Sequence, residues 1–206
     1  MRRDAIPSSI RKRRHGLKFV AAVVPVIFAA SCGSARDAAS PYAVYSAAID
    51  AVADSLGVFR EPLLILDTAV VPLPNLYDRQ GGEDLQKRVP ELESGLVGRA
   101  AAMWDRGGHL VDSFSVSADH VLLSDAFVAQ LKETAREDRP GLISTTFGRG
   151  ATVVCLAPAA VGHNQALVVV GEGCGMQDPS FAAVSVALKE KDGKWEPVYL
   201  STTWVN

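Results

Sequence analysis

The sequence predicts a single α+β domain over residues 41–206, in which N-terminal helices pack on a C-terminal antiparallel sheet of about four to five strands. Three observations lead to this class. Apolar residues recur at helical spacing before residue 136, the spacing becomes strand-like from Thr152 onward, and a tight hairpin turn lies at 191–194. About 170 residues can bury one full core but hardly two, so one domain is favoured.

The first helix and the first strand follow directly from local signals. Ser40 can cap a helix that begins at Pro41, and Gly57 supplies its C-terminal stop. One apolar stripe lies between them, formed by Tyr45, Ile49, Val52 and Leu56. The wholly apolar run 63–66 then predicts a buried strand that ends at Asp67 and Thr68.

The middle of the chain predicts one long loop and two more helices. Residues 71–83 are rich in proline, glycine and asparagine, which indicates a loop. A second helix is expected from Pro90, with an apolar side formed by Leu92, Leu96, Ala100 and Trp104. A third is expected from Asp125 to about Arg136 under a Ser124 cap, and the segment 110–124 between them is open between strand and loop.

Four strands are expected in the last third of the chain, at 153–156, 166–171, 181–189 and 195–205. The run 166–170 is apolar on both faces and should be a central strand. The Asp192-Gly193 turn joins the last two strands and puts Lys189 opposite Glu196. Pro197 has no N–H to donate, which places the last strand at an edge or at a bulge.

The cysteines Cys155 and Cys174 are expected to form a disulfide. They would face each other in a hairpin that turns at Asn164 and Gln165. Closing about 20 residues contributes ~3 kcal/mol in the loop-entropy model, and an even pair of cysteines outside the cytoplasm is usually bonded. Two buried thiols are the alternative.

Residues 1–32 predict a signal peptide. A basic stretch at 11–18 precedes twelve mostly apolar residues, 19–30, which include Pro25. Twelve helical residues span about 18 Å, well short of the roughly 30 Å hydrocarbon core of a bilayer. An export signal is therefore favoured over a membrane anchor, with a buried helix of the domain as the alternative.

The end of this segment, Ala29-Ala30-Ser31-Cys32, resembles a bacterial lipoprotein processing site. The resemblance implies that Cys32 is diacylated and becomes the new N-terminus, with 33–40 as a tether. Ordinary cleavage near Cys32 is the alternative. The stretch 13–18 also resembles a twin-arginine export signal, and the basic region of the general secretory route is the competing interpretation.

Two further resemblances concern the last quarter of the chain. The runs QALVVV at 165–170, Cys-Gly at 174–175, LKEKDGKW at 188–195 and Trp204 resemble the C-terminal half of uncharacterised bacterial secreted proteins and lipoproteins, which implies no known activity. The hairpin around Asp192 is similar to the final strands of cone-shaped folds related to nuclear transport factor 2, which implies a ligand cavity.

Charge and motifs exclude several functions. Residues 33–206 carry 14 basic and 22 acidic side chains and no basic block, so no nucleic-acid partner is expected. No nucleophile elbow, zinc-binding helix or phosphate-binding loop is present in the sequence. No cofactor and no metal site are therefore expected. His109 and Asp112, and Asp119 and His120, are close in sequence, but neither pair has an identifiable third ligand.

Two side chains remain as catalytic candidates. Asp67 closes a buried strand and could serve as a general base, although such a residue more often caps a turn, here toward Val70. His163 stands at the predicted turn beside Asn164, where an exposed turn histidine is the alternative.

Two functions from different classes follow. The favoured one is an exported bacterial envelope lipoprotein on the periplasmic or cell-surface side. It would be a non-enzymatic binding or scaffolding module that is held on the membrane by its lipid anchor, with a protein of the envelope as candidate partner. The second is a small periplasmic enzyme or ligand-binding protein with a cone-like cavity that contains Asp67 or His163.

Overall fold

The computed structural model describes residues 40–57, 59, 61–68, 79–103, 106–174, 176 and 181–205. The chain divides into two units, Met1–Ala35 and Arg36–Asn206, and every described residue belongs to the second. The predicted α+β class is confirmed. The helices are α1 (Pro41–Leu56), α2 (Arg79–Arg88), α3 (Leu96–Met103), α4 (Asp125–Glu133) and α5 (Arg139–Phe147), with a 3₁₀ turn η1 at Arg136–Asp138. The strands are β1 (Leu63–Leu66), β2 (His120–Leu123), β3 (Thr152–Leu156), β4 (Ala160–Val161), β5 (Gln165–Glu172), β6 (Phe181–Lys191) and β7 (Lys194–Val205).

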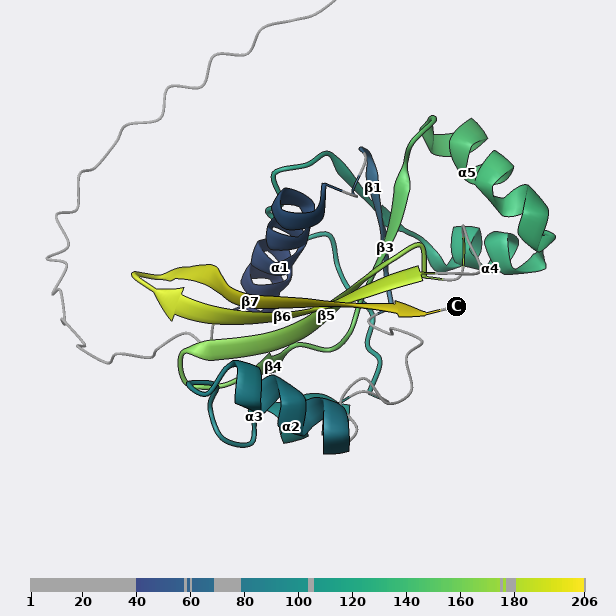
Figure 1. The fold of residues 1–206 in the computed structure, drawn as a ribbon. Helices are drawn as coiled ribbons and strands as arrows, with labels where there is room; N and C mark the ends of the chain where they lie inside the picture. Colours follow the sequence, from purple (N-terminus) through teal and green to yellow (C-terminus); the bar gives the residue numbers. More distant parts are fainter. Residues whose placement is uncertain are drawn as a thin grey trace, which may run out of the picture. The chain divides into compact units, whose positions relative to one another are not determined.

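All described strands join one mixed sheet in the order β2-β1-β3-β5-β6-β7, and β4 pairs with β5 (Figure 1). The strands from β3 to β7 pair antiparallel, as the sequence predicts, whereas β1 is parallel to both β2 and β3. The sheet is therefore larger than expected and not wholly antiparallel. The reason is that β1, β2 and β3 are separated by long helical connections, which is what parallel pairing requires.

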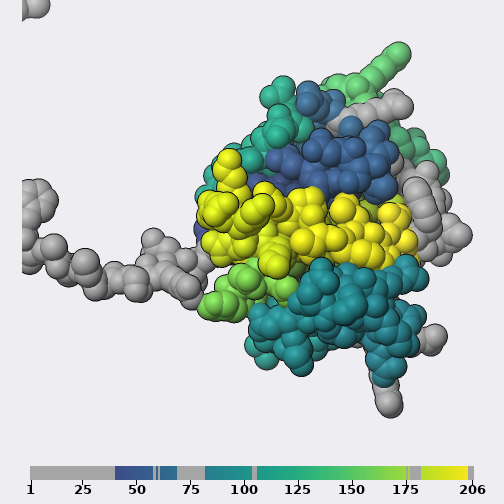
Figure 2. Space-filling view, turned by 60° about the vertical axis from the view of Figure 1, so that its left-hand side comes forward, coloured from purple at the N-terminus to yellow at the C-terminus, as the bar shows by residue number. Residues whose placement is uncertain are grey.

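Helices cover both faces of the sheet. Along β5, Ala166, Val168 and Val170 pack in one apolar cluster with α1, while Leu167 and Val169 point to the other face. That other face is covered by α2 and α3 near β4 to β7, and by α4 and α5 near β1 and β3. Figure 2 shows the yellow β6–β7 hairpin between blue α1 and teal α2 and α3. β5 is buried on both faces, which confirms its predicted central position.

Two predictions about helices are wrong. The long loop expected at 71–83 is helical from Arg79, where α2 begins, and Leu85 of this helix packs against the sheet. Residues 71–78 lie outside the described residues. The helix expected from Pro90 begins only at Leu96, after a turn in which the Leu92 N–H bonds to the Val89 carbonyl. Trp104 lies outside the described residues. The helix expected from Asp125 to about Arg136 is present as α4, which ends earlier, at Glu133, before the 3₁₀ turn at Arg136. Its predicted cap is confirmed, because the Ser124 hydroxyl accepts a hydrogen bond from the Phe127 N–H at 3.4 Å.

The C-terminal hairpin is confirmed in register and in position. Lys189 pairs with Glu196, and the turn residues Asp192 and Gly193 have φ angles of 52° and 77°. Pro197 pairs with Leu188 beside a β-bulge, and β7 is an edge strand. The proline thus occupies both of the positions that its missing N–H allows.

The predicted disulfide between Cys155 and Cys174 is present, but the expected register is wrong. The ladder pairs Cys155 with Gly171, and the chain turns at 162–165, where the Gly162 N–H bonds to the Gln165 carbonyl. Cys174 therefore lies beyond the end of β5. Positive φ angles at Gly173 and Cys174 turn the chain back over the sheet and bring the two sulfur atoms together. In the described part of the chain, no helix has both the length and the apolar character needed to cross a bilayer.

Candidate functional site

The carboxyl ends of β1 and β2 meet at one edge of the sheet, because the two strands are parallel and Leu66 pairs with Leu123. Asp67 follows β1, and Asp125 begins α4 directly after β2. His109 reaches the same edge through an isolated bridge to Thr68, next to a hydrogen bond from the Leu110 N–H to the Asp67 carbonyl. Polar side chains at this edge are where ligand sites of open sheets with parallel strands are usually found.

The side chains of Asp67, His109 and Asp125 converge at this edge. The Nδ1 atom of His109 lies 3.6 Å from Oδ2 of Asp67 and 3.9 Å from Oδ2 of Asp125. One nitrogen or oxygen atom from each of the three lies within 4.8 Å of the other two. Asp67 is the buried member, with its side chain 14% exposed, whereas the side chains of His109 and Asp125 are 71% and 69% exposed.

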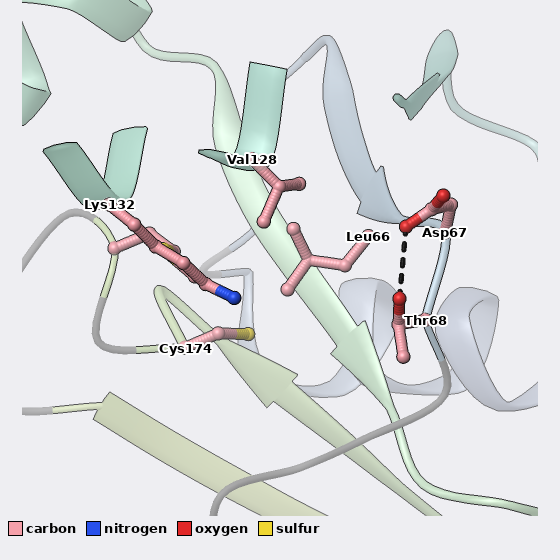
Figure 3. A pocket seen from close by; sticks show the side chains of 7 residues that line it. Leu66, Asp67, Thr68, Val128, Lys132 and Cys174 are labelled. Carbon is pink, nitrogen blue, oxygen red and sulfur yellow. Dashed lines mark hydrogen bonds between the residues drawn. The ribbon is translucent and has the colours of Figure 1, made fainter. Parts of the chain in front are cut away.

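The Asp67 carboxylate is held in place by its neighbour. The Thr68 hydroxyl donates a hydrogen bond of 3.1 Å to Oδ1 of Asp67 (Figure 3). The other carboxylate oxygen, Oδ2, lies 3.6 Å from Nδ1 of His109. The predicted turn contact toward Val70 lies outside the described residues.

A pocket of about 350 Å³ adjoins the same strand end. Most of the residues that line it are apolar or weakly polar, and two are charged: the described lining is Leu66, Asp67, Thr68, Val128, Lys132, Cys174 and Met176. Val128 and Lys132 are four residues apart on α4 and so lie on one face of that helix. Figure 3 shows Lys132 and Asp67 on opposite sides of Leu66, so the two charges flank an apolar surface.

The second candidate, His163, lies away from this strand end, in a turn that is held by a hydrogen bond to Glu93. It is exposed in the turn between β4 and β5, and its backbone N–H donates a 2.8 Å hydrogen bond to Oε2 of Glu93. That bond, together with the Arg99 guanidinium at 2.8 Å, lowers the pKa of the Glu93 carboxyl. His163 is not among the residues that line the pocket beside Asp67.

A buried glutamine completes this network. Gln165 is 6% exposed; its Oε1 accepts from the Glu93 N–H at 2.5 Å and its Nε2 donates to the Glu91 carbonyl at 2.8 Å. The amide thereby joins the start of β5 to the turn that precedes α3. These contacts fasten α3 to the sheet.

The histidine side chains contact aspartates other than the ones paired with them in the sequence. His109 meets Asp67 and Asp125 instead of Asp112, and Nε2 of His120 lies 3.2 Å from Oδ1 of Asp112. The partners of His109 are not evident from the sequence, because both Asp67 and Asp125 follow strands that are distant from it along the chain. The one signal that could have found them is that Asp67 and Asp125 each lie just beyond a short apolar strand. Cys32 lies outside the described residues.

Comparison with models of known protein families, with curated proteins and with solved structures finds no match for the chain. The site must therefore be interpreted from its own geometry. It combines an apolar pocket, two flanking charges and a group of three converging polar side chains, which is an arrangement suited to binding a small molecule.

Proposed function

We propose that the protein is an exported bacterial envelope lipoprotein whose domain binds a small molecule in the pocket beside Asp67. The observation that supports small-molecule binding is the pocket itself, about 350 Å³ in volume, with an apolar surface between Lys132 and Asp67. Small-molecule sites typically have volumes of roughly 300–1,000 Å³ and combine apolar walls with a few polar groups that orient the ligand. The volume corresponds to a compact ligand.

The lining indicates the chemistry of that ligand. Leu66, Val128 and Met176 offer apolar contact, and the Lys132 ammonium has no acidic partner among the described residues. An unpaired ammonium beside an apolar wall favours an anionic group on an apolar body. We therefore expect a small amphiphilic anion whose charged group lies toward Lys132 and away from Asp67.

Binding can be tested with the fluorescent probe anilinonaphthalene sulfonate, which joins an apolar ring system to an anionic group. Val128→Trp should fill the pocket and abolish the fluorescence increase, while Lys132→Gln should weaken it. Ala129→Trp is the matched control, because it adds the same side chain to the same helix at an exposed position outside the lining. Equal probe binding by the Val128→Trp and Ala129→Trp proteins would refute the pocket.

The membrane anchor is a separate part of the proposal, and it is supported by the sequence. If Cys32 is acylated, residues 33–40 separate the lipid from α1, and eight extended residues reach at most ~28 Å. The binding domain would then work close to the membrane surface. Cells fed labelled fatty acid should incorporate it into the protein, and a Cys32→Ala protein that labels equally would exclude this anchor.

A further inference from the structure

We propose that Asp67, His109 and Asp125 form a binding site for a divalent transition-metal ion at the edge of the pocket. The donors are one imidazole nitrogen and two carboxylate oxygens, a mixed set that suits Zn²⁺ and its first-row neighbours. Ca²⁺ and Mg²⁺ prefer oxygen ligands alone, so the histidine argues against them.

The distances between the donor atoms suit one shared ion. Bonds of about 2.0–2.2 Å to Zn²⁺ place two ligand atoms roughly 3–4 Å apart. His109 Nδ1 already lies 3.6 Å from Asp67 and 3.9 Å from Asp125, and the whole set lies within 4.8 Å. Asp67 is held by Thr68, while the two exposed side chains can rotate by the small amount that closes the set.

An ion pair alone explains this convergence poorly. Among the described residues, no Lys or Arg nitrogen forms an ion pair with Asp67 or Asp125. A contact between two largely exposed groups such as His109 and Asp125 contributes little to stability. Two carboxylates that face one histidine without a permanent cation are electrostatically suited to a divalent ion.

The position of the site gives the ion a role. Three protein ligands leave a coordination position for water or for a ligand atom, which is the pattern of open zinc sites. Asp67 belongs both to the cluster and to the pocket lining, so that position lies at the pocket edge. The ion would then bind a polar atom of a pocket ligand. This extension rests on the proposed function, whereas the metal site itself does not.

The test is a calorimetric titration with Zn²⁺ of the protein isolated as the cell processes it and stripped of metal by a chelator. We expect one ion per chain, with an affinity that falls at least about tenfold in Asp125→Asn and in His109→Gln. Both side chains are exposed, so these variants should keep the circular dichroism spectrum of the parent. Asp119→Asn and His163→Gln make the same chemical changes at exposed positions outside the cluster and should bind Zn²⁺ like the parent.

The outcomes separate the metal site from the pocket. Failure to bind one equivalent of Zn²⁺, unchanged affinity in Asp125→Asn and His109→Gln, equal losses in the two controls, or a preference for Mg²⁺ over Zn²⁺ would each overturn the metal site. The Val128→Trp protein should lose the fluorescent probe but keep Zn²⁺. A parent protein that binds the probe and not the metal would therefore refute this inference while leaving the proposed function intact.

Discussion

Reduction of the Cys155–Cys174 disulfide should destabilise the domain by an amount that the chain topology sets. The two cysteines are 19 residues apart in sequence, and both are buried. Cross-linking a loop of about 20 residues removes enough unfolded-state entropy to contribute ~3 kcal/mol. For a domain of this size, ~3 kcal/mol corresponds to roughly 6–12 °C in the melting temperature.

The assay is urea-induced unfolding of the protein with and without a thiol reductant. The double variant Cys155→Ala/Cys174→Ala is the control, because any change that reductant causes there cannot come from this bond. Reductant should lower the free energy of unfolding of the parent by about 3 kcal/mol and leave the variant unchanged. Comparing one protein in two redox states also avoids counting the cavity that the alanines create.

Two results would refute this reasoning. If thiol titration shows complete reduction while the free energy of unfolding changes by less than about 0.5 kcal/mol, the closed loop does not stabilise the domain. If reductant destabilises the double variant equally, the effect belongs to another part of the protein. Because Cys174 lines the pocket, reduction should also weaken binding of the fluorescent probe.

Four further predictions concern single side chains. Gln165→Leu should cost about 2–3 kcal/mol in urea unfolding, because both amide hydrogen bonds to Glu91 and Glu93 are lost. Ser124→Ala should cost about 1 kcal/mol through the lost α4 cap, measured in the same way. The lowered pKa of Glu93 means that its carboxylate stabilises the fold at neutral pH, and this contribution is lost as pH falls through the folded-state pKa. Glu93→Gln should therefore be less stable than the parent at pH 7, and the two stabilities should converge in acid. Burial raises the pKa of Glu172, so its penalty appears as pH rises above the ordinary value of 4.5; Glu172→Gln should be more stable than the parent at pH 7 in parallel melts and lose that advantage in acid.

The parts of the fold that the sequence predicts are those specified by neighbouring residues. Ser124 caps α4 within one turn, and the Asp192-Gly193 turn sets the β6–β7 register without help from distant segments. Two helices that the sequence does not predict, α2 and α5, lack such local signals. α2 has the sequence RQGGEDLQKR and α5 has RPGLISTTF, and both contain residues of low helix propensity. They are stabilised by packing instead, through Leu85 in α2 and Ile143 in α5, which are 7% and 2% exposed.

The candidate site was predictable only in its first residue. Asp67 stands out because a carboxylate directly follows four apolar residues, and that local pattern is visible in the sequence. Its partners depend on which strands are neighbours. Asp125 approaches it because β2 pairs in parallel with β1, and parallel pairing across a long connection leaves no hairpin signal. His109 approaches it through an isolated bridge to Thr68, a single long-range pairing that no local pattern announces. Lys132 likewise becomes part of the pocket only once α4 packs beside β1.

Helices cover the two faces of the sheet differently, and the pocket lies on only one of them. The α1 face carries the larger apolar cluster, in which Val44, Ile49 and Val168 are at most 1% exposed. The other face is shared by two separate groups of helices, α2 with α3 and α4 with α5, each with its own smaller cluster. The pocket belongs to the second of these groups, because Leu66, Val128, Cys174 and Met176 all pack in or against the cluster under α4 and α5. The disulfide lies on this divided face and ties the end of β5 to β3 beside the pocket. Cys155, Cys174 and Leu66 belong to one buried cluster, so a ligand that filled the pocket would extend the apolar packing of that cluster beside the disulfide.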